Sequence, residues 1–381
     1  MAPDLRVAVT PEVAPATSGP LVDGDARSYW IGAIPGDGTG PEVVHEARKV
    51  VDAVAEACGF DVEYVEYDLG GERYLRTGET LPDAIMDELR GLDAILLGAV
   101  GHPEVPPGVL ERDLLLRIRF ELDQYVNLRP TKLYPGVTSP VAGLGPDDVD
   151  MVFVRENSEG LYAGTGGFLH KGAAEEVALQ DSVNTRRGVE RCVRYAFDLA
   201  DSSPRRRRHV TLAHKTNVLT YAGDLWRRVF ELVAAEYPDV VTAYVHVDAA
   251  CIYLLENPGR FDVVVTDNMF GDILTDLAAT IQGGMGVAAG ANLNPAPGGV
   301  SMFEPIGGTA PDHTGRGTIN PIAAIAAAGL MLETLGEGEA ARRIDRSIRL
   351  VVPKMHSMRA GEMGFSTSVV GDMVAEAVTH A

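Results

Sequence analysis

The stretch from Tyr29 to Glu42 reads YWIGAIPGDGTGPE and carries the clearest fold signal in the chain. It begins with a short apolar run, and a proline and several glycines follow at once. Apolar residues then recur at helical spacing as far as Ala55, and Pro41 is suited to the first turn of a helix. The stretch therefore predicts a strand, a tight turn and a helix in succession.

The same alternation of strands and helices continues along the chain and favours an α/β fold, in which helices pack on a sheet. The predicted strands are 29–34, 62–65, 94–100, 150–154, 210–213, 241–245 and 262–265, and the predicted helices are 43–55, 82–90, 185–200, 222–236, 271–281 and 321–335. The last helix follows a glycine-rich stretch and suggests that the chain returns to its first domain. A domain interrupted by another implies a cleft between the two, where ligands usually bind.

Composition and charge exclude several classes of protein. The 381 residues suggest two domains at roughly 150 residues each. With 54 acidic against 33 basic residues the net charge is −21, which argues against nucleic acid or a membrane surface as the main partner. No apolar run approaches the roughly 18 residues of a membrane span. The three cysteines lie far apart, which excludes a disulfide scaffold and favours the cytoplasm.

A pair of acidic residues points to a metal site. Asp272 and Asp276 follow a predicted strand and are four residues apart, so they share one face of a helix. Neighbouring carboxylates repel one another unless a cation joins them, and Mg²⁺ prefers oxygen ligands. Asp248, which follows another predicted strand, is a possible third ligand. The alternative is that these acids only complement the helix dipole.

Three arginines form a second group of candidate residues. Arg119, Arg129 and Arg155 could together hold carboxylates, because a guanidinium group binds a carboxylate through two hydrogen bonds. Tyr162 lies in a glycine-rich loop and Lys215 follows a strand, so either could donate or accept a proton if it is buried near a charge. Taken singly, each of these residues could equally lie on the surface.

A glycine-dense segment after Phe303 is the third candidate site. Glycine lets a ligand approach the backbone closely, and an aspartate can bind a ribose diol, although the segment could also be a plain surface loop. The Rossmann fingerprint is absent after the predicted strands. The letters of Gly336-x-Gly338-x-x-Ala341 match it, but this stretch follows a helix and is therefore discounted.

Five ordered motifs together resemble the β-decarboxylating dehydrogenases, the family of isopropylmalate, isocitrate, homoisocitrate and tartrate/D-malate dehydrogenases. They are IPGDGTGPE at 34–42, NLRP at 127–130, RENSEGLY at 155–162, NMFGDILTD at 268–276 and EPIGGTAPD at 304–312. The resemblance implies an isopropylmalate dehydrogenase-like fold, with two α/β domains, a cleft between them and a dinucleotide site unlike that of the Rossmann fold. It also implies a mobile extension at 1–27, a cofactor-binding domain at 28–124 plus 283–381, and a domain for substrate, metal and dimerisation at 125–282.

The resemblance assigns roles to the candidate residues. Substrate carboxylates would be held by Arg119, Arg129 and Arg155, and Mg²⁺ or Mn²⁺ by Asp248, Asp272 and Asp276. Lys215 would be the general base and Tyr162 the acid. The residues that would bind the cofactor are Glu304, Gly307, Gly308, Thr309, Ala310, Asp312 and Asn320. Lys215 and Asp248 would reach the site from the partner subunit, which implies a homodimer with shared active sites.

The cofactor can be predicted from Asp312. NAD enzymes of the family have an aspartate after Gly-x-Ala-Pro, whereas NADP enzymes tend to have Lys-Tyr there, and a carboxylate would repel a 2′-phosphate. We therefore expect NAD. Gly307 departs from the family, which commonly has histidine there, so a contact to adenosine is lost. A non-catalytic NAD-binding relative is the alternative that this departure leaves open.

The substrate follows from the residues before Arg119. Isocitrate enzymes have Ser and Asn where this chain has Asp113 and Leu115, and homoisocitrate enzymes tend to have Arg in place of Leu116. Leu115 and Leu116 would form an apolar pocket that suits an isopropyl group. The expected reaction is the NAD-dependent oxidative decarboxylation of 3-isopropylmalate to 2-oxoisocaproate, in leucine biosynthesis. Tartrate/D-malate enzymes also carry leucines here, so tartrate, D-malate or a pathway-specific malate analogue stays open.

Overall fold

The computed structural model describes residues 27–204 and 206–380. The extension predicted at 1–27 lies outside the described residues except for Arg27. The guanidinium group of Arg27 donates hydrogen bonds of 2.8 and 2.6 Å to the carboxylate of Glu337, just ahead of strand β1 (Ser28–Gly36). No helix in the described part of the chain is long and apolar enough to cross a membrane.

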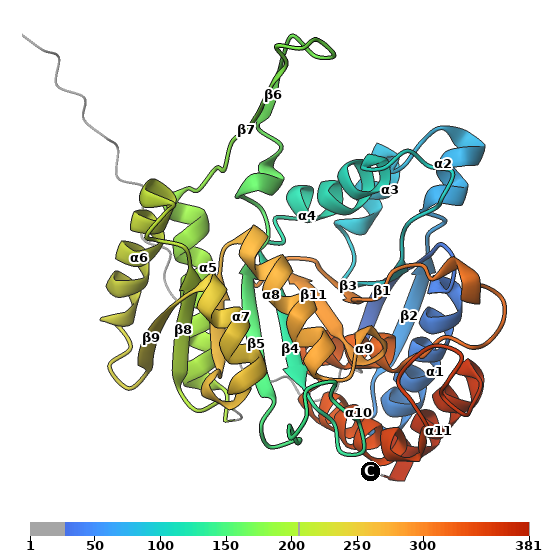
Figure 1. Cartoon of the computed structure of the whole chain (residues 1–381). Coiled ribbons are helices and arrows are strands. Elements are labelled where there is room, and N and C mark those ends of the chain that lie inside the picture. Colours follow the sequence, from blue (N-terminus) through green and yellow to red (C-terminus); the bar gives the residue numbers. More distant parts are fainter. Residues whose placement is uncertain (1–26, 205, 381) are drawn as a thin grey trace, which may run out of the picture.

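A ten-stranded sheet runs through the described residues, in the order β2-β1-β3-β12-β11-β4-β5-β10-β8-β9 (Figure 1). The remaining strands of this sheet are β2 (Asp61–Glu66), β3 (Ala94–Ala99), β4 (Val126–Lys132), β5 (Asp150–Glu156), β8 (His209–His214), β9 (Val241–His246), β10 (Val263–Thr266), β11 (Ala289–Leu293) and β12 (Ser301–Pro305). Both ends of the sheet are parallel, and the central pairings β12–β11, β11–β4 and β4–β5 are antiparallel. The α/β class predicted from the sequence is confirmed.

The predicted strands are all present, but the central strands β4, β11 and β12 were missed. Strand β4 has polar residues at its inward positions, since Asn127, Arg129 and Thr131 are buried while Leu128 and Pro130 are only half-buried. Hydrophobic alternation cannot reveal a strand whose buried face is polar.

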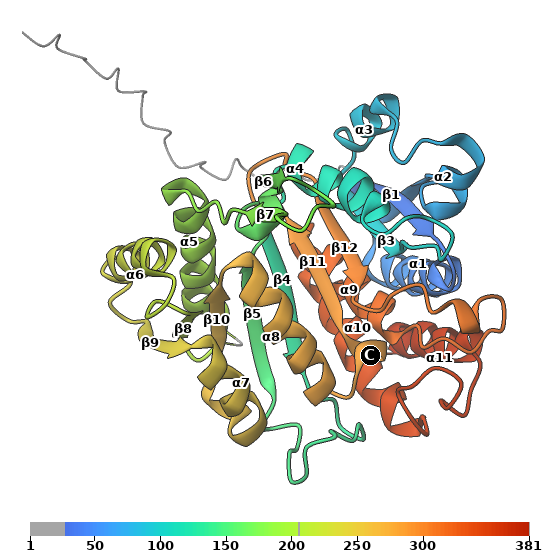
Figure 2. The same ribbon diagram turned by 45° about the horizontal axis from the view of Figure 1, so that its top comes forward.

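Helices cover both faces of the sheet (Figure 2). Their bounds are α1 (Gly40–Cys58), α2 (Gly71–Thr77), α3 (Asp83–Leu89), α4 (Arg117–Glu121), α5 (Arg186–Ser202), α6 (Thr220–Ala234), α7 (Val247–Glu256), α8 (Asn268–Ile281), α9 (Ile322–Thr334), α10 (Gly338–Val351) and α11 (Thr367–His380). The alternation of β5 separates the two faces: Val152 and Val154 pack in the core with α5, and Phe153 packs with α7 and α8. The same large core joins α5 to α1, α9, α10 and α11.

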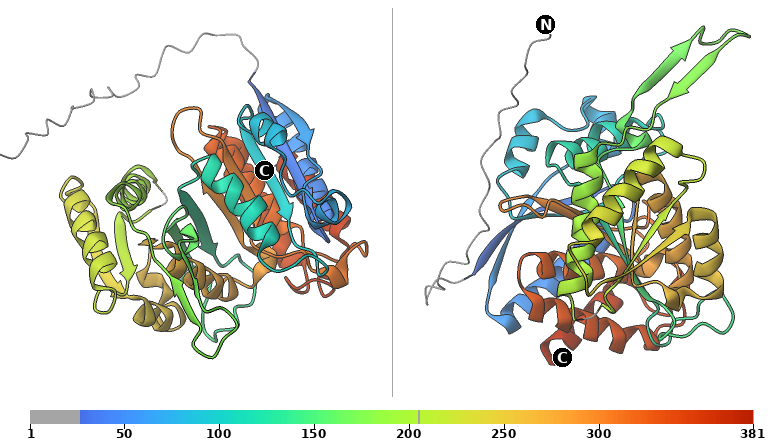
Figure 3. Two further views of the ribbon diagram at one scale, coloured as in Figure 1. Left: turned by 90° about the horizontal axis from the view of Figure 1, so that it is seen from above. Right: turned by 90° about the vertical axis from the view of Figure 1, so that its left-hand side faces the viewer.

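A two-stranded hairpin of β6 (Gly166–Leu169) and β7 (Val177–Gln180) projects away from the body of the molecule (Figures 1 and 3). Its apolar side chains Phe168, Leu169, Val177 and Leu179 are 42–57% exposed. Such a run of apolar residues on an isolated arm is typical of a surface that another molecule covers.

Candidate active site

Two of the three predicted arginines lie on the antiparallel centre of the sheet. Arg129 is on β4 and Arg155 on β5, and the register pairs Asn127 with Arg155 and Arg129 with Phe153, so both arginines point to the same face. Arg119 approaches from α4, and its interaction with the charge of Arg155 places it in the same cluster. Arg155 is only 2% exposed. Buried charges of this kind require polar partners.

Arg155 is held by the first turns of α8. Its guanidinium group forms an ion pair with Asp272, and its Nε and one terminal nitrogen donate to Asn268 Oδ1 at 3.0 and 2.8 Å. Gly271 lies directly over the stem of Arg155, where an added Cβ would come within 2.5 Å of Arg155 Cγ. The motif FGD therefore brings α8 close enough for the arginine and the aspartate to pair.

Tyr162 joins the same cluster. Its hydroxyl donates to Asp272 Oδ2 at 2.7 Å, and its ring lies 5.3 Å from the guanidinium carbon of Arg155. Burial and the neighbouring Asp272 raise the pKa of Tyr162. Burial alone would raise the pKa of Asp272 too, but the charge of Arg155 and the hydrogen bond from Tyr162 outweigh it, so its pKa is lowered. Tyr162 is therefore protonated and can serve as an acid, while Asp272 stays ionised.

The carboxylates of α8 suit a cation but do not form a complete site in one chain. Burial and the nearby charge of Asp272 raise the pKa of Asp276, and a bound divalent cation would relieve this repulsion. The described residues contain no cluster of three or more His, Cys, Asp or Glu side chains that could hold a metal ion. The predicted third ligand, Asp248, is therefore not beside Asp272 and Asp276 within the chain.

Asp248 instead pairs with Lys215, the predicted base. Lys215 Nζ donates to Asp248 Oδ1 at 2.7 Å, and the hydrogen bond from Lys215 lowers the pKa of Asp248. The pair follows the ends of β8 and β9, which lie beyond β10 in the sheet as counted from β5. The Asp248 side chain is 66% exposed. The structure thus divides the predicted residues into a buried cluster around Asp272 and a more exposed pair.

Arg119 and Arg129 are tied together by Glu304, which was predicted to bind the cofactor, and by Asn127 and Asn292, which were given no role from the sequence. Arg119 donates to Glu304 Oε1 at 3.2 Å, and Arg129 Nε donates to Asn127 Oδ1 at 2.8 Å. Asn292 hydrogen-bonds both Asn127 and Glu304. Asn127 could have been found from its spacing, because residues two apart on a strand share a face and Arg129 is two residues on. No local signal marked Asn292.

The predicted leucines lie on an unusual turn. Residues Glu111–Leu116 form a π-helical segment that runs directly into α4, and such segments are frequent at functional sites. Leu115 and Leu116 are both half-buried, and Leu115 packs against the core cluster that contains Leu114 and Ile118. Leu116 belongs to no core cluster of the described residues. It is the leucine with more freedom to contact a ligand.

The predicted cofactor residues surround a cavity of about 810 Å³ on the α1 side of the cluster. Gly307, Gly308, Ala310 and Asn320 line it. Thr309 and Asp312 belong to the same loop but not to the lining, with Asp312 exposed, and Glu304 points instead to Arg119. Nothing but Met285 Cβ, at 3.9 Å, would meet a Cβ added at Gly307, so the cavity has room for a side chain there.

The motif at 34–42 anchors the loop 307–317, which carries several of the predicted cofactor residues. The carbonyl of Thr309 accepts from the backbone N–H of Thr39 at 2.9 Å and from its hydroxyl at 3.2 Å. The carboxylate of Glu42 accepts from the N–H groups of Gly315 and Gly317 at 2.7 and 3.1 Å. Both of these glycines have positive φ, so the loop depends on its glycines as well as on its anchor.

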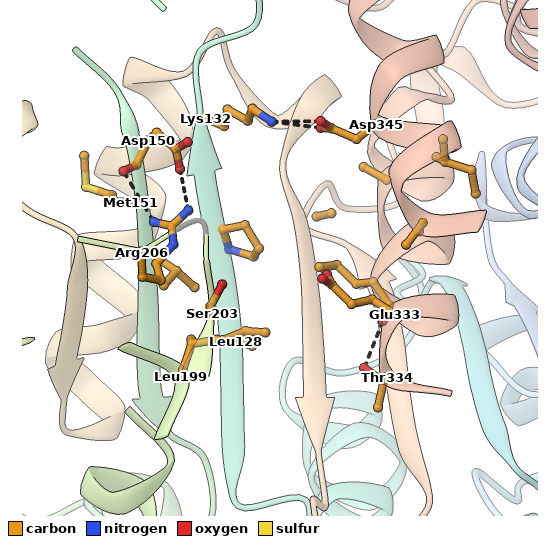
Figure 4. A pocket seen from close by; sticks show the side chains of 18 of the residues that line it. Leu128, Lys132, Asp150, Met151, Leu199, Ser203, Arg206, Glu333, Thr334 and Asp345 are labelled. Carbon is orange, nitrogen blue, oxygen red and sulfur yellow. Dashed lines mark hydrogen bonds and ion pairs between the residues drawn. The ribbon is translucent and has the colours of Figure 1, made fainter. Parts of the chain in front are cut away.

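A second cavity of about 580 Å³ lies on the opposite face of β4 (Figure 4). Its walls come from α5 on one side and α9 and α10 on the other, and Leu128, Met151 and Leu199 contribute apolar surface. An ion pair between Lys132 and Asp345 crosses the cavity, as Figure 4 shows, with 2.9 Å between Nζ and Oδ1. None of the predicted site residues lines this cavity in the described part of the chain.

Comparisons with known proteins agree with this fold and site. The family model of isocitrate/isopropylmalate dehydrogenase matches residues 30–378. The 3-isopropylmalate dehydrogenase of Thermobifida fusca is 55% identical over 356 residues, which cover 93% of this chain and 99% of the relative. That of Mycobacterium tuberculosis is 53% identical and covers 91% of this chain and 98% of the relative.

A solved structure gives the same result. The isocitrate dehydrogenase from Methylococcus capsulatus matches with a TM-score of 0.81 at 38% identity, over 92% of this chain and 99% of that one. Fold and site together define a dehydrogenase of the α/β class with a buried arginine and carboxylate cluster. The chain belongs to the isocitrate/isopropylmalate dehydrogenase family, as the five motifs indicated.

Proposed function

We propose that this protein catalyses the NAD-dependent oxidative decarboxylation of 3-isopropylmalate to 2-oxoisocaproate, with release of CO₂ and NADH. The observation that carries this proposal is the convergence of Arg119, Arg129 and Arg155 on Asp272 and Tyr162. Cations that are buried beside an acid and a carboxylate suit a small dicarboxylate substrate. Relatives at 52–57% identity that are named 3-isopropylmalate dehydrogenase favour the isopropyl-substituted malate.

The arginines would bind the two carboxylates of the substrate. Within the described residues, Arg129 donates a side-chain hydrogen bond only through its Nε, so both of its terminal nitrogens remain for a ligand. The Nε of Arg119 is buried without a hydrogen-bond partner there. Buried donors without an acceptor lower the stability of the folded protein unless a ligand accepts hydrogen bonds from them. We infer that a substrate carboxylate lies between these two side chains.

The proton transfers would be carried out by Lys215 and Tyr162. When bound, Mg²⁺ or Mn²⁺ would lower the pKa of the 2-hydroxyl group, and NAD would supply the acceptor for the hydride. Lys215 would take the hydroxyl proton, and the resulting β-keto acid loses CO₂ readily. Tyr162, whose raised pKa keeps it protonated, would then donate its proton to the enol carbon. Asp272 and Asp276 would hold the cation, with Asp248 as a third ligand.

We propose a homodimer in which Lys215 and Asp248 complete the site of the other subunit. In support, this pair is separate from Asp272 and Asp276 within the chain. Helices α7 and α8 also carry exposed apolar side chains, such as Ile252 at 53% and Ile273 at 52%. Exposed apolar surface of this extent is typical of a subunit interface.

The shared site can be tested by mixing two inactive variants. Lys215→Met and Tyr162→Phe should each be inactive as pure homodimers. Co-expressed in equal amounts, they should regain about a quarter of the wild-type activity, because about half of the dimers are mixed and each has one complete site. Two copies of one variant, mixed in the same way, serve as the control. A mixture that stays inactive would show that each chain uses its own lysine.

The substrate is tested by a spectrophotometric assay of NADH formation in the presence of Mg²⁺. The panel contains 3-isopropylmalate, D-malate, tartrate, isocitrate and homoisocitrate. The highest kcat/KM is expected for 3-isopropylmalate, with NAD strongly preferred over NADP because the Asp312 carboxylate would repel a 2′-phosphate. A clear preference for D-malate or tartrate would replace the substrate and leave the decarboxylation chemistry in place. Absence of turnover with every substrate, together with NAD binding, would indicate the non-catalytic alternative.

We further propose the domain division predicted from the motifs, 28–124 plus 283–381 for the cofactor and 125–282 for substrate, metal and dimerisation. In support, the cofactor cavity is lined largely by the first part, and Arg129, Arg155, Tyr162 and Asp272 belong to the second. A cytoplasmic location is proposed as well. It is supported by the cysteines Cys58, Cys192 and Cys251, which are all free thiols.

A further inference from the structure

A buried polar network lies beneath the two arginines that have free donors. Its centre is Asn292 on β11, which is fully buried and lies opposite Asn127 in the antiparallel pairing with β4. The side-chain oxygen of Asn292 accepts from the amide groups of Asn127 and Asn157 at 2.8 and 3.0 Å. Its side-chain nitrogen donates to Glu304 Oε1 at 2.9 Å. The carboxamide is thus bonded on both sides.

Each side of the network leads to one arginine. Asn127 Oδ1 accepts from Arg129 Nε at 2.8 Å, and Glu304 Oε1 accepts from Arg119 at 3.2 Å. A hydrogen bond to Nε restricts the rotation of the guanidinium plane and directs both terminal nitrogens away from the bonded residue. Asn292 is therefore linked to Arg119 through Glu304 and to Arg129 through Asn127. It makes no hydrogen bond to either arginine itself.

Sheet register explains why these groups meet. Gly290, two residues before Asn292, lies opposite Glu304 on β12, and a Cβ added there would come within 2.9 Å of Arg129 Nε. The missing side chain lets Arg129 extend across β11 towards Glu304. Glu304 is then the carboxylate that offsets two buried cations, and Asn292 keeps it in place between them.

We propose that Asn292 is a positioning residue for the substrate, because it fixes the orientation of Arg119 and Arg129 through Glu304 and Asn127. The proposal rests on the proposed function, since the ligand of the two arginines is taken to be the carboxylates of a substituted malate. The expected signature is a defect in substrate binding that leaves NAD binding unchanged. Asn292 is buried beneath the arginines, so a direct contact with the substrate does not account for such a defect.

The test compares two substitutions at position 292 with a matched control. Asn292→Asp keeps the size and both acceptor bonds, but places a carboxylate where a donor faced Glu304. Asn292→Ser removes the bond to Glu304 by shortening the side chain. Each should raise the Kd for 3-isopropylmalate at least tenfold, measured by calorimetry with Mg²⁺ and without NAD, while the Kd for NAD changes less than twofold. Asn294→Asp makes the same chemical change two residues along, where the side chain bonds only the backbone of Leu122 and Ala296, and should bind like wild type.

A rescue separates positioning from a general loss of structure. In the double variant N292D/E304Q the acid and the amide exchange places, so the hydrogen bond between the two positions can form again. It should recover at least half of the lost binding free energy, whereas a merely unstable protein would lose binding further. Thermal unfolding of each variant, together with NAD binding of the single variants at position 292, reports that the chain is folded.

Substrate affinity within twofold of wild type in both single variants would overturn the proposal. The same holds if NAD affinity falls in parallel with substrate affinity. If wild type prefers another malate in the assay panel, the substrate assignment fails on its own. The variants are then compared on that malate, where the ratio to wild type still tests Asn292.

Discussion

Strand β4 presents alternate residues of its seven-residue segment to a polar cluster on one face of the sheet and to a cavity on the other. On one face, Asn127 and Arg129 belong to the polar cluster with Glu304 and Asp272. On the other face, Leu128 and Lys132 line the groove between α5 and α10 (Figure 4). The two faces differ in whether their charged side chains keep hydrogen-bond donors free for a ligand.

The difference lies in how the charges are paired. In the groove, Asp345 accepts from Lys132 at 2.9 Å and from Arg349 at 3.1 Å, so the charges are satisfied within the chain. In the cluster, buried arginines keep free donors, and burial lowers the pKa of Arg129 to about 10. Unpaired buried donors are unfavourable for folding unless a ligand accepts from them, as a substrate carboxylate would do at Arg119 and Arg129.

The largest effect is expected for Asp272→Asn on the polar face. The substitution removes a proposed metal ligand and the charge that pairs with Arg155, so kcat/KM should fall about a thousandfold or more, roughly 4 kcal/mol of transition-state stabilisation. The assay is NADH formation with excess Mg²⁺. Asp345→Asn makes the same change in the groove and should stay within twofold of wild type. Full activity of the wild type in EDTA would contradict the assignment of Asp272 to a metal.

The next effect is expected for Leu116→Ala, at the edge of the same face. An isopropyl group adds three carbons, each worth about 0.8 kcal/mol when buried and together about 2.4 kcal/mol, so wild type should favour 3-isopropylmalate over malate by roughly sixtyfold. Truncating Leu116 should remove much of this preference and leave the turnover of malate nearly unchanged. The readout is the ratio of kcat/KM for the two substrates. Leu75→Ala, an exposed leucine on α2, is the control.

A smaller effect is expected in the groove, on stability and not on activity. Asp345→Asn leaves the partly buried Lys132 without its charge partner and should lower the free energy of unfolding by about 1–2 kcal/mol, measured by urea unfolding. Burial by itself would raise the pKa of Asp345, but the charges and hydrogen bonds of Lys132 and Arg349 outweigh it, so the pKa of Asp345 is lowered.

The pH dependence of this effect follows from the lowered pKa. A carboxyl with a lower pKa in the folded state stabilises the protein above the pKa of the unfolded carboxyl, about 3.9, and loses this contribution as the pH falls further. The difference between wild type and Asp345→Asn should therefore be constant above about pH 5 and shrink below pH 4. A difference that is independent of pH would mean that packing, and not charge, is responsible.

The smallest effect is expected at the cavity that Gly307 and Gly308 line, where a substitution would add a contact to the predicted cofactor. Gly307→His places a ring where the structure leaves space and where the family commonly has one. A stacked aromatic contact is worth about 0.5–1.5 kcal/mol, so the Kd for NAD should fall about threefold to tenfold. Gly307→Ala adds only a Cβ and should leave the Kd unchanged. Weaker NAD binding in Gly307→His would show that the loop requires glycine.

The sequence predicted those parts of the molecule that depend on short-range geometry. Asp272 and Asp276 share a helix face because they are four residues apart, and the helix beginning near Asn268 confirms this. The alternation of apolar strands and amphipathic helices was enough for the α/β class. Strand β4 was missed because its inward positions carry polar residues whose partners lie far away in the chain, and β11 and β12 were missed as well.

The roles of the site residues divide in the same way. The family motifs marked Arg129 and Arg155, but nothing local indicated Asn292 or showed that Glu304 faces Arg119 and not the cofactor cavity. Likewise, the motif at 34–42 identified the family without revealing that Glu42 anchors the backbone at Gly315 and Gly317. These contacts depend on how loops pack, which one sequence does not show.

The sequence by itself determined the fold class, the family and the types of residue available for chemistry, because periodicity and motif spacing are properties of the chain alone. Only the tertiary structure decided which of these residues meet. Asn127 and Asn292 are 165 positions apart and become neighbours solely because β4 and β11 pair in one register. A shift of one strand by one residue would turn one of the two side chains to the opposite face and separate the pair. The same register that places Arg129 in the polar cluster places Lys132 in the groove behind it.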